Sequence, residues 1–486
     1  MTISLARLIG ADGPLPEGAQ DIAVHGLTAD SRAVKPGYVF AALPGSSVDG
    51  SKFIPQAMAA GAVAVLAGEG VDYPGVPVIA VNNPRLVFAR MAARYFGKQP
   101  DLAVAVTGTN GKTSVASFVR EIWEAMGFRA ASLGTVGVVG PSGATELQHT
   151  TPDPMKLHEI AAALAEDHVT HLALEASSHG LDQFRLDGLR LSAGAFTNIT
   201  RDHLDYHPAF ADYFAAKMRL FEALLPSGAP AVVNADSSQA ADVIARARAR
   251  GLEVFTVGHS GAALKLLNVT REGFGQRLDV QGPKHRHALL LPLVGDFQTS
   301  NALVAAGLVI ATGGEEILAM HSLEKLKGAK GRLDLVGYAK GVAPIFVDYA
   351  HTPDALENAI QALRPYVKGK LSVVFGCGGD RDKGKRPLMG AVAARLAGKA
   401  YVTDDNPRTE DPAAIRRDIM AAAPGAIEIG NRAEAIRAAV AELADGDILL
   451  VAGKGHEEGQ KIGKTVIPFS DHDAVRAAIA GIDYHG

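Results

Sequence analysis

The sequence is short of features that would place it outside the cell or in a membrane. Cys377 is its only cysteine, which excludes an internal disulfide and fits a reducing compartment. No run of about 18 apolar residues occurs, and the apolar stretch near the N-terminus is too short for a signal peptide. We therefore expect a cytoplasmic protein without membrane insertion.

Strong charge of either sign is also lacking. The net charge of −4 gives no support to a nucleic-acid partner or an acidic membrane surface. A hydrophobic content of 48% with 21% charged residues is typical of a globular enzyme. At 486 residues the chain exceeds what one core usually organises, so we expect two to four domains.

Hydrophobic runs that lead into polar loops alternate with helical patterns along the chain. They divide it into residues 1–98, 99–330 and 331–486. This alternation predicts an α/β fold of mostly parallel, doubly wound sheets. Functional residues should then follow the carboxyl ends of strands.

Residues 102–127 are the most informative stretch. The β-branched run LAVAVT stops at Gly108, and the following turn leads into a helix whose apolar residues recur at helical spacing. Such a loop aims backbone N–H groups at anionic oxygen, while Lys112 supplies an ammonium and Thr113 a hydroxyl suited to Mg²⁺. Only Thr109 and Asn110 separate Gly108 from Gly111, so this phosphate loop is two residues tighter than the general one.

Two further strands of this region end in polar residues. HLALE ends at Glu175, and AGAFTN is followed by a loop that contains His203. In a parallel sheet both emerge on the same edge as Thr113, which makes a candidate set for Mg²⁺. The alternatives are a helix-capping or salt-bridged Glu175 and a locally bonded His203. By its spacing, Lys217 resembles a solvated helix lysine.

The last region carries weaker signals. The run from Gly376 to Asp380 is like a dinucleotide fingerprint but has Arg381 in place of the third glycine. Four cations within residues 381–387 fit a solvated face or a clamp for phosphate or carboxylate. The run ending at Asp348 mimics a Walker-B strand, but its distance in sequence from the loop disfavours a Mg²⁺ role.

In combination, these motifs resemble the Mur ligases over essentially the whole chain. The resemblance rests on GTNGKT, EASSHGLDQFR, FTNITRDHLDYH, VDYAHTPDAL, GDRDKGKRP, DNPRTEDP and GKGHE, and on LTADSRAVKPGYVFAALPGSSVDG near the N-terminus. It implies three domains, which we expect at residues 1–98 for a UDP-sugar-binding α/β domain, 99–330 for a central P-loop-type ATPase and 331–486 for a Rossmann-like domain that binds the amino acid.

The resemblance implies amide-bond formation driven by ATP and Mg²⁺ in peptidoglycan precursor synthesis. The D-Glu γ-carboxylate of UDP-N-acetylmuramoyl-L-alanyl-D-glutamate attacks the γ-phosphate of ATP to give an acyl phosphate and ADP. The incoming amine then displaces phosphate from the acyl phosphate through a tetrahedral intermediate. Activation is needed because a carboxylate would have to expel oxide, whereas phosphate leaves readily. We expect a monomer whose partners are these small molecules.

Matching motifs also imply individual roles. ATP contacts are implied for Gly108, Thr109, Asn110, Gly111, Lys112, Thr113, Asn301, Arg332 and Asp348. Contacts to one Mg²⁺ are implied for Thr113 and Glu175, and contacts to a second metal ion for His203 and a carbamylated Lys217. A catalytic role is implied for Lys112, Glu175, His203, Lys217 and Arg332. Contacts to the uridine diphosphate of the UDP-substrate are implied for Ser31, Ser46 and Ser47, although Ser46 and Ser47 replace larger polar residues of the family. Contacts to its muramoyl-dipeptide portion are implied for Thr150, Thr151, Ser177, Gln183 and Arg185.

The box Asp405-Asn406-Pro407-Arg408 resembles that of members that add meso-diaminopimelate. This amino acid carries a distal carboxylate that lysine lacks, and a guanidinium binds a carboxylate with two hydrogen bonds. The implied pocket consists of Arg381, Asp405, Asn406, Arg408, Gly453 and Glu457. In the alternative, Arg408 caps a helix or pairs with Glu410.

Two other functions are weighed against this one. Folylpolyglutamate synthetase has a similar phosphate loop, but the N-terminal stretch and the DNPR box argue against it. A P-loop ATPase switch without ligase chemistry would release phosphate without needing both other substrates.

Overall fold

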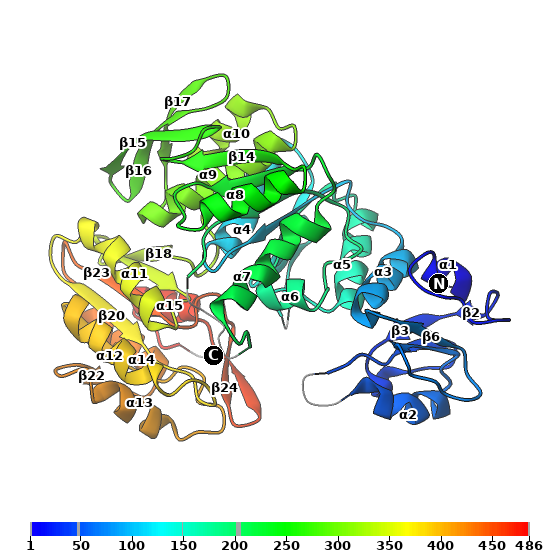
Figure 1. The fold of residues 1–486 in the computed structure, drawn as a ribbon. Helices are drawn as coiled ribbons and strands as arrows, with labels where there is room; N and C mark the ends of the chain where they lie inside the picture. Colours follow the sequence, from blue (N-terminus) through cyan, green and yellow to red (C-terminus); the bar gives the residue numbers. More distant parts are fainter. Residues whose placement is uncertain (1, 46–48, 148, 201–205, 485–486) are drawn as a thin grey trace. The chain divides into compact units, whose positions relative to one another are not determined.

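The computed structural model describes residues 2–45, 49–147, 149–200 and 206–484. By internal contacts the chain divides into two compact units (Figure 1). The first consists of residues 1–267, 279–287 and 300–323, and the second of residues 268–278, 288–299 and 324–486. Each unit is built around parallel strands with helices on both faces, as the alternating pattern predicted.

A four-stranded parallel sheet opens the first unit. Its order is β3 (Gly26–Thr28), β4 (Tyr38–Ala41), β5 (Ala64–Gly68) and β6 (Val78–Val81). Successive residues point to opposite faces, so Val39 packs with α1 (Leu5–Ile9) and α3 (Pro84–Phe96), whereas Phe40 packs with α2 (Ile54–Ala59). Both faces are buried, which explains the nearly continuous apolar runs in the sequence.

The central sheet has eleven strands and carries the phosphate loop. Its order is β10 (Gly143–Thr145), β9 (Gly137–Gly140), β8 (Ala130–Gly134), β11 (His171–Glu175), β7 (Leu102–Thr107), β12 (Leu191–Phe196), β13 (Pro230–Asn234), β14 (Glu253–Gly258), β15 (Leu264–Glu272), β16 (Gly275–Gln281) and β17 (Arg286–Leu291). From β8 to β15 every neighbouring pair is parallel. The carboxyl ends of β7, β11 and β12 therefore lie side by side.

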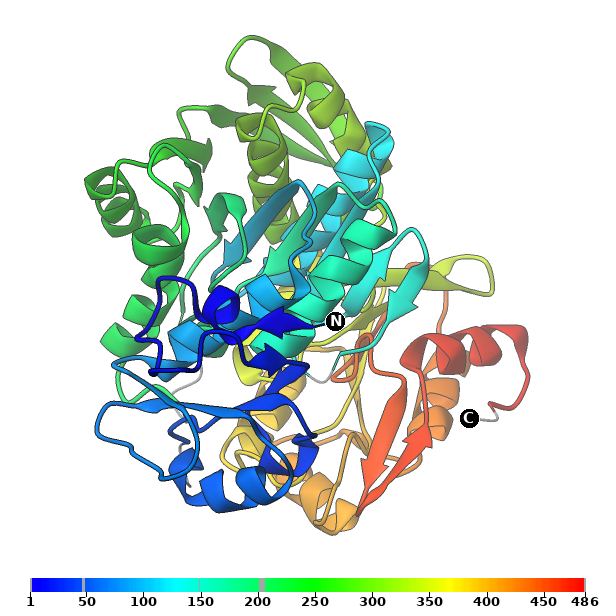
Figure 2. The same cartoon turned by 90° about the vertical axis from the view of Figure 1, so that its right-hand side faces the viewer.

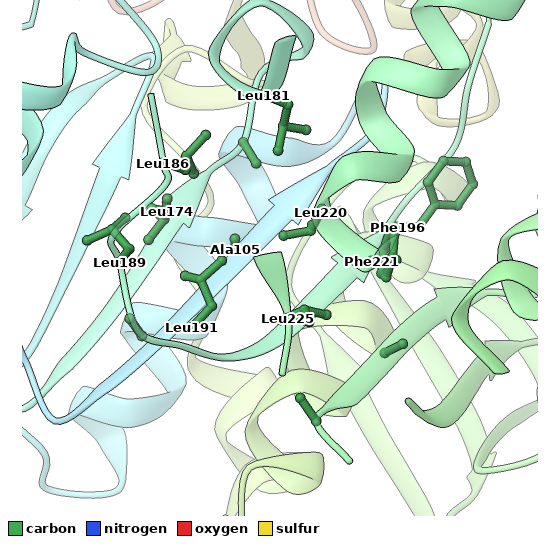
Figure 3. Close-up of a cluster of buried hydrophobic side chains, with 14 of the residues drawn as sticks. Ala105, Leu174, Leu181, Leu186, Leu189, Leu191, Phe196, Leu220, Phe221 and Leu225 are labelled. Atoms are coloured by element: carbon green, nitrogen blue, oxygen red, sulfur yellow. The ribbon is translucent and has the colours of Figure 1, made fainter. Parts of the chain in front are cut away.

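Apolar side chains fill one face of this sheet. Ala105, Leu174, Leu191 and Phe196 from the strands meet Leu220, Phe221 and Leu225 from the segment after α7 (Phe210–Arg219) (Figure 3). The same cluster includes residues of α5 (Pro154–Glu166) and α8 (Ala240–Ala249). Helix α4 (Lys112–Ala125), which follows the phosphate loop, has nine buried residues. The core thus fixes the strand ends that carry the polar loops.

The second unit contains a six-stranded sheet. Its order is β18 (Asp334–Ala339), β19 (Ala343–Asp348), β23 (Ile448–Ala452), β20 (Leu371–Phe375), β21 (Lys399–Val402) and β22 (Ile427–Glu428), with only β18 antiparallel to its neighbour. One face packs on α11 (Pro353–Leu363), α12 (Lys385–Leu396) and α13 (Pro412–Met420), and the other on α14 (Arg432–Ala441) and α15 (Asp471–Ala480). A hairpin of β24 (Gly459–Ile462) and β25 (Thr465–Pro468) follows β23 and appears as two orange-red arrows in Figure 2.

Edge strands are where the sheets depart from the expected parallel pattern. The pairs β8 with β9, β9 with β10 and β18 with β19 are antiparallel. Short hairpins of this kind extend a parallel core without needing a crossover helix. None of the helices among the described ranges is both long and apolar enough to cross a membrane.

Candidate active site

The phosphate loop connects β7 to α4 through two glycines that the fold requires. Gly108 has a φ of +150°, and a Cβ there would lie 2.0 Å from Thr197 Oγ1. Gly111 has a φ of +88°, and its Cβ would lie 2.3 Å from Asn301 Oδ1. Gly111 also occupies the N-cap of α4, where the absence of a side chain leaves the amides of the first turn open to an anion.

The loop that follows β12 holds the phosphate loop in place. The backbone N–H of Thr109 donates to Asn198 O at 2.8 Å, and that of Asn110 donates to Asn198 Oδ1 at 3.0 Å. In return, Thr197 Oγ1 donates to Asn110 O at 2.6 Å. These bonds hold the phosphate loop against the carboxyl end of β12. Asn198 was not among the predicted site residues, although it ends the quoted AGAFTN run.

Two lysines converge on one carbonyl oxygen of this loop. Lys112 Nζ donates to Gly108 O at 2.9 Å and to Thr109 O at 2.8 Å. Lys217 Nζ donates to the same Gly108 O at 2.7 Å and lies 4.4 Å from the centre of the Tyr213 ring.

The interpretation of Lys217 as a solvated helix lysine is wrong, because only 1% of the residue is exposed. Spacing on α7 could not reveal this, since the phosphate loop that covers Lys217 comes from a distant part of the sequence.

Glu175 ends β11 at the same edge as the phosphate loop. It pairs in register with Val106 of β7 and is 1% exposed. Its Oε1 accepts the backbone N–H of Thr135 at 2.7 Å, and its Oε2 accepts the Thr135 hydroxyl at 3.2 Å. These bonds are neither a helix cap nor a salt bridge, so neither alternative for this carboxylate describes the structure.

The residue types at this edge fit Mg²⁺. Thr113 and Glu175 offer hard oxygen donors, which Mg²⁺ prefers. Within the described ranges no group of three His, Cys, Asp or Glu side chains could hold a metal by itself. Magnesium at nucleotide sites is usually bound by one or two carboxylates and by phosphate oxygens, so Thr113 and Glu175 fit the protein's part of one such site. His203 lies outside the described residues.

A second polar cluster lies beside Glu175. Thr151 Oγ1 donates to the backbone oxygen of Glu175 at 2.9 Å and accepts from Ser177 Oγ at 3.0 Å. Arg185 donates to Thr151 O at 2.7 Å and to Gln183 Oε1 at 2.8 Å. Thr150 Oγ1 lies 3.1 Å from Thr135 Oγ1. All five residues predicted for the muramoyl-dipeptide portion are thus gathered near the end of β11.

The predicted uridine contacts are only partly described. Ser31 is nearly buried, at 9% exposed, and its hydroxyl donates to Gln56 Oε1 at 3.0 Å. Ser46 and Ser47 lie outside the described residues.

Arg332 and Asp348 belong to the second unit. The carboxylate of Asp348 accepts the backbone N–H groups of Leu333 at 2.7 Å and Ala350 at 2.8 Å. Burial raises the pKa of Asp348, and nearby Arg332 opposes this rise. The guanidinium of Arg332 lies 4.8 Å from the centre of the Tyr349 ring. Asn301, the third predicted nucleotide contact outside the loop, is on α9 (Asp296–Ala311) beside Gly111.

Arg408 has an unusual backbone held by the β24–β25 hairpin. Its φ is +52°, a left-handed conformation that is uncommon for a residue with a side chain. Its N–H donates to Lys461 O at 3.0 Å, and its carbonyl accepts from the N–H of Gly463 at 2.6 Å. Its Nη1 donates to Gly379 O at 2.7 Å. Arg408 therefore does not pair with Glu410, which binds Arg386 at 2.9 Å instead.

Buried Asn406 and Asp405 form a polar cluster with half-buried Glu457 near this arginine. Asn406 Nδ2 donates to Glu457 Oε2 at 2.9 Å. Burial alone would raise the pKa of Asp405, but Lys454 and Arg432 hold it below its usual value. A Cβ on Gly453 would lie 2.7 Å from Asp405 Oδ2, which explains the glycine. Arg381 is exposed and donates to Asp380 O at 3.0 Å.

Three buried cations of the second unit were missed by the sequence analysis. Lys454 is 0%, Arg386 1% and Arg432 2% exposed. Arg386 pairs with Glu410 and Asp418, so one of the four cations in residues 381–387 is a structural residue and not part of a solvated face. Lys454 lies within the quoted GKGHE motif, which was the available signal for it.

Comparisons with known proteins agree along the whole chain. Family models match residues 23–96 (Mur ligase family, catalytic domain), 106–309 (Mur ligase middle domain) and 331–455 (Mur ligase, glutamate ligase domain). A relative from Bradyrhizobium diazoefficiens, described as UDP-N-acetylmuramoyl-L-alanyl-D-glutamate--2,6-diaminopimelate ligase, is 55% identical over 98% of this chain and 99% of its own. A relative from Caulobacter vibrioides with the same description is 54% identical over 96% and 97%.

Solved structures show the same relationship. A structure of UDP-N-acetylmuramoyl-L-alanyl-D-glutamate--2,6-diaminopimelate ligase matches with a TM-score of 0.74 and 32% identity over 99% of both chains. The folylpolyglutamate synthase of Mycobacterium tuberculosis shares the fold, with a TM-score of 0.61 at 19% identity over 76% of this chain and 92% of its own. The chain belongs to the Mur ligase family, with the family's three-domain α/β architecture.

Proposed function

We infer that this protein is an ATP-dependent amide ligase that adds meso-diaminopimelate to the D-Glu γ-carboxylate of UDP-N-acetylmuramoyl-L-alanyl-D-glutamate. The observation that carries this conclusion is the end-to-end match, at 55% identity, to relatives described by that reaction. The reaction belongs to cytoplasmic peptidoglycan precursor synthesis, and we expect the enzyme to act there as a monomer.

The first step brings two anions together, so the phosphate loop must neutralise charge. The first-turn amides of α4 and the Lys112 ammonium would bind the ATP phosphates, with Asn301, Arg332 and Asp348 as further nucleotide contacts. Thr113 and Glu175 would hold one Mg²⁺, and His203 with carbamylated Lys217 would hold a second. Bound Mg²⁺ would screen the phosphate charge. The γ-carboxylate oxygen then bonds to the γ-phosphorus, and the bond to ADP breaks.

The second step needs a neutral amine close to the acyl carbon. The amine adds to the acyl carbon to give a tetrahedral intermediate, from which phosphate leaves as the amide forms, and one proton is released. Ser31, Ser46, Ser47, Thr150, Thr151, Ser177, Gln183 and Arg185 would orient the UDP-substrate. Arg381, Asp405, Asn406, Arg408, Gly453 and Glu457 would orient the amino acid, and correct orientation lowers the entropic part of the barrier.

The electrostatics at Gly108 O support carbamylation of Lys217. Two ammonium groups bound to one carbonyl oxygen repel each other, and the repulsion is stronger in a buried site than in water. Loss of a proton from the Lys217 ammonium, followed by addition of CO₂ to the resulting amine, forms a carbamate and releases two protons in all. That change replaces one of the two positive charges with a negative charge, which favours Lys112 and adds oxygen donors for Mg²⁺.

Release of phosphate tests the function directly. We expect release from ATP only when both UDP-muramoyl dipeptide and meso-diaminopimelate are present. Equal release without either substrate would favour a P-loop ATPase switch. Release with folate polyglutamates in place of the UDP-substrate would favour the folylpolyglutamate alternative.

A further inference from the structure

Lys454 is a fully buried lysine at the centre of the polar cluster in the second unit. It follows β23 and is 0% exposed. Its Nζ donates to Asn406 Oδ1 at 3.1 Å and to Glu457 Oε2 at 3.0 Å. A buried ammonium is costly unless it is paired and hydrogen-bonded, so these contacts account for its presence there.

The contacts of Lys454 fix the orientation of the Asn406 amide. Asn406 Oδ1 accepts from Lys454 and from the backbone N–H of Lys461 at 2.9 Å, while Nδ2 donates to Glu457. A reversed amide would place its NH₂ group against two donors. Within the part of the chain that the structure describes, both side-chain bonds to Glu457 use Oε2, which leaves Oε1 to accept from a ligand ammonium.

Lys454 also sets the charge of the cluster. Arg432 and Asp471 form an ion pair with bonds of 2.6 and 2.8 Å and cancel each other. Apart from Arg408, which faces the ligand carboxylate in the proposed pocket, Asp405 and Glu457 are negative and Lys454 is positive, which leaves one negative charge. That charge suits a single ligand ammonium, while a neighbouring ligand carboxylate can be bound by Arg408.

We propose that Lys454 is a positioning and specificity residue: it orients Asn406 and holds this cluster at one negative charge, so that the pocket prefers an amino-acid end with both an ammonium and a carboxylate over an end with an ammonium alone. The proposal rests on the proposed function. Without Lys454 the cluster would carry two negative charges, which attract a lone ammonium and repel a carboxylate.

The test compares acceptors in the full-length enzyme. The ratio of kcat/KM for meso-diaminopimelate to that for L-lysine is measured for wild type and for Lys454→Met, which keeps the length and bulk of the side chain. We expect the ratio to fall by about tenfold or more in the variant. KM for ATP should stay within about threefold of wild type, because a change confined to the amino-acid pocket should not alter ATP binding. A large rise in KM for ATP would instead indicate loss of the whole site.

Three further variants make the result decisive. Lys454→Arg keeps the charge and should retain most of the preference, whereas Lys464→Met, at an exposed position of the β24–β25 turn, should retain all of it. If the methionine variant does not fold, Lys454→Gln carries the same expectation. An unchanged ratio in a folded neutral variant, or an equal loss of rate with both acceptors, would overturn the proposal. Wild type that does not use meso-diaminopimelate would instead contradict the proposed function.

Discussion

Two lysines that share Gly108 O are the residue-scale feature with the clearest chemical consequence. Lys112 lies in the phosphate loop and Lys217 on α7, and both ammonium groups lie within 2.9 Å of that oxygen. In the proposed first step, the Lys112 ammonium would neutralise phosphate charge. We propose that the Lys217 ammonium is replaced by a carbamate that binds a metal ion.

Lys217→Ala should be nearly inactive, because the alanine variant cannot form a carbamate. Short carboxylic acids or added bicarbonate should restore part of the rate if the site needs an anion. Lys217→Arg, which keeps a positive charge but cannot be carbamylated, should be as inactive as the alanine variant. The measurement is the initial rate together with the intact mass of gently handled enzyme. A fully active alanine variant with no carbamoyl mass in wild type would contradict this role.

Arg408 is the second residue-scale feature. Hydrogen bonds with Lys461 and Gly463 hold its backbone in a left-handed conformation that arginine rarely adopts. Both side-chain hydrogen bonds of Arg408 within the described ranges use Nη1, at 2.7 Å to Gly379 O and 3.5 Å to Asn406 O. The N–H groups of Nε and Nη2, on the other edge of the guanidinium, therefore take no part in these two bonds. That edge is the one that can bind a carboxylate with two bonds.

Arg408→Ala should raise KM for meso-diaminopimelate by about 30-fold or more, the effect of losing ~2 kcal/mol from a desolvated charge pair. KM values for ATP and the UDP-substrate should change by no more than a few fold. Lysine should remain a poor acceptor, because the substitution removes the unpaired Arg408 charge but adds no contact that binds lysine. Arg417→Ala, an exposed arginine on α13, is the matched control. Steady-state kinetics that leave KM for meso-diaminopimelate unchanged would show that Arg408 does not contact its carboxylate.

At the scale of elements, a buried ion pair joins two helices of the second unit. Arg432 on α14 and Asp471 on α15 are each 0% exposed at the side chain and share two hydrogen bonds. Arg432 also donates to Ala452 O at the end of β23 at 2.9 Å. The pair therefore fixes both helices to the strand that precedes Lys454.

Asp471→Asn should lower the free energy of unfolding by about 3 kcal/mol or more, because it leaves a buried guanidinium without its counter-charge. The matched control is Asp473→Asn in the same first turn of α15, where the exposed pair with Arg476 contributes at most ~1 kcal/mol. Urea denaturation followed by circular dichroism compares the two. Equal midpoints for the two variants would show that the buried pair does not stabilise this unit.

Elements with strong local signals could be predicted from the sequence, and edge strands could not. The run LAVAVT with the helix after it became β7 and α4 as expected. The antiparallel strands β9 and β10 were not expected, since their residues are mostly exposed or half-buried and carry little apolar pattern. Their pairing depends on neighbours in the sheet and not on their own residues.

Candidate site residues also divide into those with a local sequence signal and those without one. Motif positions such as Glu175 and Arg408 could be named from the sequence, but the burial of Lys217 and Lys454 could not. Each of these lysines is covered by segments far away in the chain, Lys217 by residue 108 and Lys454 by residue 406. A spacing pattern reports only the face of one helix, so it cannot reveal contacts of this range.

At the scale of the whole molecule, the account assigns nucleotide and uridine binding to different domains of one chain. Lys112→Ala should therefore abolish ATP turnover while the UDP-substrate still binds with a Kd within a few fold of wild type. Lys156→Ala, at an exposed position on α5, is the control and should leave both unchanged. Calorimetry with the UDP-substrate decides between the outcomes. Loss of that binding in a folded Lys112→Ala variant would contradict the division of sites between domains.

The acceptor used by the wild-type enzyme tests the central claim most directly. Enzyme, ATP, Mg²⁺ and UDP-N-acetylmuramoyl-L-alanyl-D-glutamate are offered meso-diaminopimelate, L-lysine or L-glutamate, and both phosphate and the mass of the amide product are measured. The account predicts efficient product formation with meso-diaminopimelate and little with either of the others, because only the first places a distal ammonium and carboxylate beside Glu457 and Arg408. Product formed from L-lysine or L-glutamate as efficiently as from meso-diaminopimelate would contradict it.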